Sequence, residues 1–129
     1  MADFELGKEN NIIIDKSFAF AVKTVNVCRS LSQERKEYVL SKQLLKSGTS
    51  IGANIQEAQA AQSRKDFVSK MSIAGKEARE TKYWLDLLSA TGYIDIHDAD
   101  NAGLLIDIEE IVKILTSIIK TTKESDYEE

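Results

Sequence analysis

Apolar residues recur along the chain at the spacing of one face of an α-helix, in four stretches separated by short polar breaks. The pattern predicts helices near residues 12–31, 34–62, 65–91 and 97–123. Short connections between long helices make sequential helices antiparallel. We therefore expect an all-α fold, a single antiparallel up-down-up-down four-helix bundle that forms one domain over residues 1–129.

Capping residues mark the breaks between the predicted helices. Ser63, with Asp66 three residues later, has the pattern of a capping box, and Gly92 stands where a left-handed residue ends a helix. Asp95 and Asp98 repeat the capping pattern ahead of the last helix. The acidic segments at the two ends of the chain lie outside the predicted helices, and we expect them to be frayed.

The first and last predicted helices carry more apolar surface than one core-facing stripe requires. On the first helix, Phe18 and Val22 lie nearly opposite Phe20 and Val27. Surplus apolar surface either finds a partner or aggregates. Thick stripes in a small bundle are the alternative interpretation, but an excess on two helices favours a homo-oligomer. The residues that we assign to the oligomer interface are Phe20, Val27, Leu31, Leu105, Val112 and Ile119.

Two glycines lie four positions apart inside the second predicted helix, at Gly48 and Gly52. Each glycine costs a helix ~1 kcal/mol relative to alanine, so the pair needs a compensating gain. Close approach of a neighbouring helix supplies one. A phosphate-binding loop is excluded, because no Gly-Lys-Ser/Thr follows and no strand precedes. Asn54 borders the core stripe, and we expect it to complete this helix-packing motif with a buried hydrogen bond.

Three motifs of the chain stand out together: SGTSIGANIQEA, RKDFVSKMSIAGKEARETKYWLDLLSATGYID and EEIVKILTSIIKTTK. With them, the chain from about Lys16 to Lys123 resembles the bacterial four-helix-bundle proteins encoded within intervening sequences of large-subunit ribosomal RNA genes. It is also similar to the accessory proteins of diversity-generating retroelements. The resemblance implies a homopentamer of bundles arranged as a barrel. The retroelement branch further implies binding of nucleic acid and of a reverse transcriptase.

The charges of the chain are segregated although its net charge is only −4. Residues 16–82 hold 13 Lys/Arg and 6 Asp/Glu, a net of +7, whereas residues 83–129 hold 3 and 11, a net of −8. A negative total argues weakly against nucleic acid as a partner. Basic stripes that are repeated around an oligomer would nevertheless form a positive band that attracts phosphates.

Candidate nucleic-acid-binding residues lie on the outer faces of the second and third predicted helices. They are Arg35, Lys42, Lys46, Lys65, Lys76 and Arg79. No base-reading motif occurs, so binding of RNA or DNA should be led by the phosphate backbone and tolerate any sequence. The alternative is that these faces are merely solvated and the chain is a protein-binding scaffold or adaptor with no nucleic-acid role. Its partner would then contact the flank of the third predicted helix, at Trp84 and its neighbours Ile73, Glu80 and Leu87.

No residue pattern indicates an enzyme, a metal site or a cofactor. A di-iron bundle needs a Glu-x-x-His motif on each of two helices, and His97 is the only histidine. Cys28 fits a small core residue. No apolar run reaches the ~20 residues of a membrane span, and the N-terminus lacks a secretion signal. We expect a cytoplasmic, non-enzymatic binding protein without cofactor or membrane contact.

Overall fold

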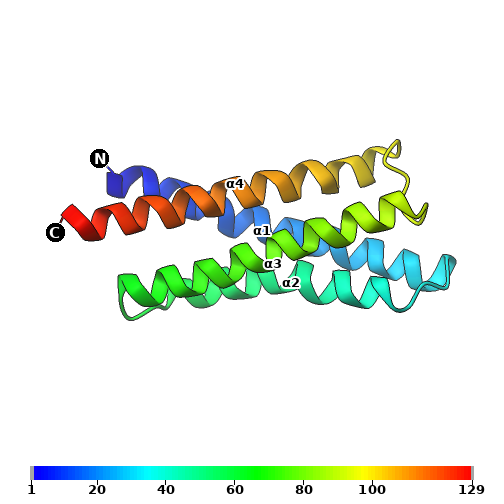
Figure 1. The fold of residues 1–129 in the computed structure, drawn as a ribbon, viewed down its shortest axis with the longest axis horizontal. Coiled ribbons are helices and arrows are strands. Elements are labelled where there is room, and N and C mark those ends of the chain that lie inside the picture. The colour runs from blue at the N-terminus through cyan, green and yellow to red at the C-terminus, as the bar shows by residue number, and fades with distance from the viewer. Residues whose placement is uncertain (1, 129) are drawn as a thin grey trace.

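The structure, a computed structural model, describes residues 2–128 of the chain and the side chains of residues 6–125. It contains four helices, α1 Ala2–Glu34, α2 Leu40–Gln59, α3 Arg64–Ala90 and α4 Ala99–Glu128. The helices run alternately up and down, so that both ends of the chain lie at the same end of the bundle (Figure 1). No strand occurs within the described residues. The predicted all-α four-helix bundle is confirmed.

Each helix packs against two others in a closed ring, with α4 returning to contact α1. The diagonal pairs make no backbone contact, because the core side chains fill the space between them. All four helices contribute, and large buried side chains include Phe20, Leu44, Ile51, Met71, Leu85, Ile108 and Leu115. The apolar stripes predicted for the second and third helices therefore face the core.

The two terminal helices are longer than the periodicity predicts. α1 begins at Ala2 and α4 continues to Glu128, so residues 2–11 and 124–128 are helical where fraying was expected. Contacts with other helices explain the extension of α1. Leu6 packs against the core, and the Asn10 amide donates to Oε1 of Gln59 on α2 at 2.6 Å. Local apolar spacing does not reveal such long-range contacts.

α2 begins at Leu40, later than predicted, because residues 35–39 form a loop. Lys36 adopts a left-handed φ of 56° there. The buried Glu37 carboxylate accepts hydrogen bonds of 2.6–3.1 Å from the backbone N–H groups of residues 39–41. Burial raises the pKa of Glu37, but these hydrogen bonds outweigh it and leave the pKa below its ordinary value. A carboxylate thus satisfies N–H groups that the start of a helix leaves free.

The other helix ends carry the predicted caps. Oγ of Ser63 accepts the backbone N–H of Asp66 at 3.0 Å, which caps α3. Gly92 has a φ of 83° directly after α3, a conformation that glycine adopts without strain. Ahead of α4, the Asp98 carboxylate accepts the backbone N–H of Asp100 at 2.9 Å. The signals at Ser63 and Gly92 are confirmed, whereas Asp98 and not Asp95 caps α4, because the helix begins at Ala99 and the Asp95 carboxylate accepts the backbone N–H of His97 ahead of it.

Candidate binding surfaces

The two glycines of α2 face α1. A Cβ built on Gly48 would lie only 2.8 Å from Cγ2 of Thr24, whereas one on Gly52 would meet Oγ of Ser17 at an ordinary 3.5 Å. Thr24 and Ser17 are both buried. The helices therefore approach most tightly at Gly48, while Gly52 leaves room for a methyl group.

Asn54 does not act as the sequence suggested. It is half-buried, and its amide donates to the backbone carbonyl of Ser50, one turn earlier in α2, at 2.8 Å. Within the part of the chain that the structure describes, the Asn54 amide makes no hydrogen bond to another helix. A short polar side chain inside a helix often bonds back to its own helix in this way, so the expected contribution to helix packing is wrong.

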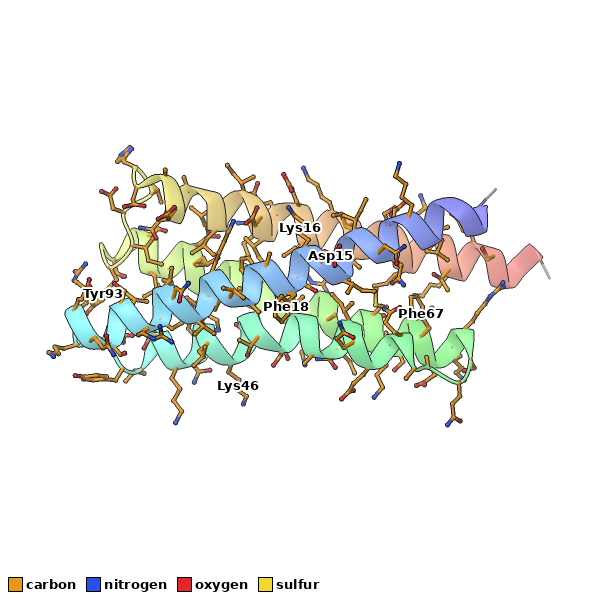
Figure 2. The ribbon with its side chains drawn as sticks, turned by 180° about the vertical axis from the view of Figure 1, so that it is seen from behind. Asp15, Lys16, Phe18, Lys46, Phe67 and Tyr93 are labelled. Atoms are coloured by element: carbon orange, nitrogen blue, oxygen red, sulfur yellow. The ribbon has the colours of Figure 1, made fainter. Side chains whose placement is uncertain are left out.

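The outer side of α1 and α2 forms one apolar surface. It comprises Ile14, Phe18, Val22, Val25, Leu45 and Ala53. Figure 2 shows Phe18 where the two helices lie side by side. The Phe18 side chain is 69% exposed and that of Val22 is 48% exposed. A hollow of about 280 Å³ lies beside Phe18 and over Gly52. We call this surface the α1–α2 face.

The predicted oligomer interface is partly wrong. Phe20 is 1% exposed and Leu31 is 3% exposed, so both belong to the core of a single chain. The remaining assigned residues are half-buried and pack against that core: Val27, Leu105, Val112 and Ile119. α1 does carry two apolar stripes, but the outward stripe is the one that contains Phe18. The helical projection could not tell which stripe faces inward, because both are similarly apolar.

Lysines of α1 are paired with acidic residues of α4. Lys16 contacts Glu110 at 2.6 Å and Asp107 at 3.6 Å, and Lys23 contacts Asp107 at 2.8 Å. The hydrogen bond to Glu110 raises the pKa of Lys16 above its ordinary value, with burial opposing the rise and Asp107 adding to it. These ion pairs tie the two terminal helices together and neutralise the charges of Lys16 and Lys23.

Five of the six candidate nucleic-acid-binding residues are exposed on α2 and α3. They are Lys42, Lys46, Lys65, Lys76 and Arg79. None of them forms an ion pair with a carboxylate in the described residues. Figure 2 shows Lys46 projecting from α2 away from the bundle. These five cations of α2 and α3 therefore carry charge that no ion pair among the described residues neutralises.

Arg35, the sixth candidate, lies in the loop before α2 and not on the helix. Its guanidinium donates to the backbone carbonyls of Gly92 and Tyr93 at 3.3 Å each. It also stacks over the Tyr93 ring, 5.0 Å from the centroid. Arg35 thus holds the α1–α2 and α3–α4 loops together, and the structure does not support its place in a basic stripe on α2.

A second hollow, which we call the loop-end hollow, lies where α1 and α2 meet their connecting loop. It has a volume of about 310 Å³ and is lined by Val25, Cys28, Arg29, Ser32, Tyr38, Ser41, Lys42 and Leu45. The Tyr38 side chain is 60% exposed. Sequence reasoning placed residues 34–62 in one helix, so it missed Tyr38 and the position of Tyr38 beside Arg29. Only the loop brings this ring beside two cations.

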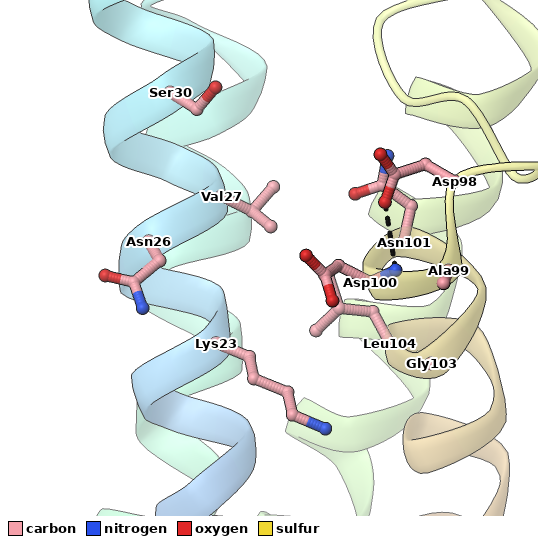
Figure 3. A pocket seen from close by; sticks show the side chains of 10 residues that line it. All are labelled: Lys23, Asn26, Val27, Ser30, Asp98, Ala99, Asp100, Asn101, Gly103 and Leu104. Atoms are coloured by element: carbon pink, nitrogen blue, oxygen red, sulfur yellow. Dashed lines mark hydrogen bonds between the residues drawn. The ribbon is translucent and has the colours of Figure 1, made fainter.

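A third hollow lies between α1 and the start of α4 (Figure 3). Its volume is about 520 Å³, and its walls bear Lys23 from α1 and Asp98 and Asp100 from the start of α4. Lys23 is paired with Asp107, and Asp98 caps α4. No group of three or more His, Cys, Asp or Glu within the described residues is placed to hold a metal ion. Lys23 and Asp98 in this hollow therefore have structural roles, in an ion pair between α1 and α4 and in the cap of α4.

Trp84 is half-buried and packs against the core, so it is less available than the scaffold interpretation assumed. Its indole N–H donates to Oε1 of Glu80 at 3.3 Å, and the ring of Tyr83 meets it edge-on at 5.1 Å. Ile73, one of the neighbours in that interpretation, is 41% exposed.

Among the described residues, no helix is apolar and long enough to cross a membrane.

Comparison with known proteins agrees with this fold. The family model of the 23S rRNA-intervening sequence protein matches residues 9–117. The chain is also similar to a solved structure from Bacteroides thetaiotaomicron VPI-5482, described as a protein with unknown function from the S23 ribosomal protein family. That similarity has 54% sequence identity and a TM-score of 0.82, over 87% of this chain and 98% of that chain.

No curated protein matches the chain. Neither matching description names an enzymatic activity. The family model spans most of the residues, and the resemblance to the proteins of ribosomal RNA intervening sequences is confirmed. The chain therefore belongs to the 23S rRNA-intervening sequence protein family.

Proposed function

We propose that this chain is a non-enzymatic, homo-oligomeric nucleic-acid-binding protein that holds phosphate backbones on its α2–α3 basic surface. We define that surface by Lys42, Lys46, Lys65, Lys76 and Arg79. The observation that carries the proposal is that these five exposed cations lie on two adjacent helices with no carboxylate partner among the described residues, whereas Lys16 and Lys23 of α1 are paired with α4. Unpaired surface cations gain most from phosphate, because no existing ion pair must be broken.

The net negative charge of the chain does not oppose this proposal. Much of the acidic charge lies on α4, where Asp107 and Glu110 already bind lysines of α1. Screening at physiological salt limits charge interactions to about 8 Å. Phosphates on the outer side of α2 and α3 would therefore respond mainly to the local cations.

Self-association would multiply the basic surface. The α1–α2 face supports it, because Phe18 and Val22 leave a contiguous apolar area in water. The family resemblance supplies the number five and the barrel. Repeating a weak phosphate-binding surface on several subunits raises the effective concentration of the second and later contacts, and so strengthens binding of a long nucleic acid.

The test is binding of structured RNA and of duplex DNA near physiological salt. Replacing Lys65, Lys76 and Arg79 together by glutamine should weaken binding at least tenfold for every sequence, and should flatten the salt dependence by about two to three phosphate contacts. The matched control replaces Lys113 and Lys120 of α4 by glutamine. Absence of binding, or equal losses in both variants, would refute the proposal.

A second candidate function is a protein-binding scaffold with no nucleic-acid role. The observation in its favour is the exposure of Phe18, since apolar surface of this kind also fits a protein partner. The same experiment separates the two functions. If the protein binds neither RNA nor DNA near physiological salt, the scaffold function takes the lead.

A further inference from the structure

We propose that the loop-end hollow binds one unpaired nucleotide, so that single strands are preferred over duplexes. The base would stack on Tyr38, and its flanking phosphates would contact Arg29 and Lys42. This inference rests on the proposed function and names its substrate class: RNA or DNA that exposes unstacked bases.

The chemistry of the hollow fits a base and its phosphates. Its lining includes the apolar side chains of Val25, Cys28 and Leu45 together with the cations Arg29 and Lys42. An aromatic ring beside a positively charged groove is the combination by which proteins hold single strands without reading their sequence. A duplex keeps its bases stacked inside, so it can offer phosphates to the two cations but no base face to Tyr38.

Tyr38 is available for stacking. Its ring is 60% exposed, and in the part of the chain that the structure describes it forms no hydrogen bond or ring contact. The backbone beside it is nevertheless held firmly, because the Glu37 carboxylate accepts three N–H groups at the start of α2. A ring on an anchored backbone loses little freedom when it binds.

The two cations are likewise unoccupied by acidic partners. No carboxylate among the described residues forms an ion pair with Arg29 or Lys42. Glu37 is buried and directed at backbone N–H groups, and exposed Glu34 accepts a hydrogen bond from Ser30 at 3.0 Å. Phosphates reaching the hollow would therefore meet two cations that no described carboxylate contacts, although the charge of the buried Glu37 acts on Cys28 in the lining.

The hollow is separate from the exposed phenyl ring of the α1–α2 face. Arg29 lies three helical turns along α1 from Phe18, a separation of about 16 Å at the rise of an α-helix. The two hollows of this side also share no lining residue. Val25 and Leu45 belong both to the α1–α2 face and to the hollow, so a contact between subunits that is confined to the Phe18 end of the face leaves room for a nucleotide near the loop.

The experiment measures fluorescence anisotropy of labelled oligouridine, oligothymidine and a duplex, each about 12 nucleotides long, near physiological salt. Tyr38→Ala should weaken binding of the single strands about tenfold, the usual size of a stacking loss. Tyr38→Phe keeps the ring and should stay within about twofold of the native protein. Duplex binding should be unchanged in both. The matched control is Tyr83→Ala, which removes an exposed tyrosine of α3.

The outcomes separate this inference from the proposed function. A selective loss with either oligouridine or oligothymidine supports the inference and tells whether RNA or DNA is the better ligand. The inference fails if Tyr38→Ala leaves single-strand binding unchanged, weakens duplex binding equally, or causes the same loss as Tyr83→Ala. In that case, salt-dependent binding through Lys65, Lys76 and Arg79 would still support the proposed function. If no nucleic acid binds, both fail.

Discussion

Alanine at Gly48 should destabilise the bundle, whereas alanine at Gly52 should stabilise it. Both glycines lie inside α2, so both substitutions gain the same helix propensity, ~1 kcal/mol. They differ in what the new methyl group meets. At Gly52 it makes ordinary contacts of 3.5–3.7 Å with Ser17, but at Gly48 it would lie 2.8 Å from Cγ2 and 3.1 Å from Oγ1 of Thr24.

Thr24 has little freedom to move away from a methyl group at position 48. It is 1% exposed, its hydroxyl donates to the carbonyl of Phe20 at 2.9 Å, and branching at its Cβ restricts its rotamers. Overpacking of this kind costs ~1–3 kcal/mol. After the propensity gain, Gly48→Ala should lose about 1 kcal/mol, and Gly52→Ala should gain up to about 1 kcal/mol. Each kcal/mol corresponds to about 4 °C in Tm for a chain of this size.

The assay is thermal and urea unfolding, followed by far-ultraviolet circular dichroism. All variants are compared at one protein concentration, because assembly makes Tm depend on it. A double-mutant cycle with Thr24→Ser isolates the contact, since serine keeps the hydroxyl and removes Cγ2. In that background Gly48→Ala should recover about 1 kcal/mol.

Equal stabilisation by alanine at both positions would refute this account of the close approach. So would a loss at Gly48 that Thr24→Ser does not relieve. Leucine at Gly52 provides a further check, because a Cβ on Gly52 would already lie 3.6 Å from the Ser17 backbone oxygen, and a longer side chain must pass it. An unchanged Tm for Gly52→Leu would show that the glycine serves another purpose.

Three other predictions test the assembly and the buried groups. Light scattering should give a mass several times 14.4 kDa, and a monomeric native protein would contradict this expectation. Phe18→Asp should lower the mass while the helicity persists. Phe20→Asp should instead unfold the chain, because a charge would enter the core. Glu37→Gln should cost about 1–3 kcal/mol near neutral pH. Because the pKa of Glu37 is lowered in the folded state, the stabilisation by its carboxylate is present above the ordinary pKa of about 4.3 and is lost as the pH falls through the folded value. The stabilities of the native protein and of Glu37→Gln should therefore converge in acid. A difference in stability that stays constant with pH would exclude a role for the charge. Burial, with a smaller contribution from the Glu37 charge, raises the pKa of Cys28 to about 12. A thiol reagent should therefore label the native protein far more slowly than the urea-unfolded protein. Equal labelling rates would show that the thiol is accessible in the native protein.

Local signals account for what the sequence predicted correctly. The apolar spacing of α2 and α3 is single and strong, and Ser63 and Gly92 act through hydrogen bonds or backbone conformations within a few residues. The order and direction of the helices follow from short connections. Membership in the family likewise followed from contiguous motifs. These features need no knowledge of distant residues.

The remaining features depended on which helices meet. Arg35 is a plausible phosphate ligand until the α3–α4 loop brings Tyr93 beneath it. Glu37 looks like any surface glutamate until burial directs it at the N–H groups of α2. The partners of Arg35 lie 57 and 58 positions away in the sequence, so no local pattern predicts them. The partners of Glu37 lie only two to four positions away, but the apolar spacing placed this loop inside one predicted helix and so hid the cap.

The choice between the two apolar stripes of α1 shows the same division. Hydrophobicity alone established that α1 has surplus apolar surface, and it could not rank Phe18 against Phe20. The packing of α2 decided between them: Gly48 admits Thr24 and Gly52 admits Ser17 on the inward side of α1. That fit buries Phe20 and leaves Phe18 in water. The sequence of a helix determines where its apolar stripes lie, but the shape of the surface that packs against the helix determines which stripe joins the core.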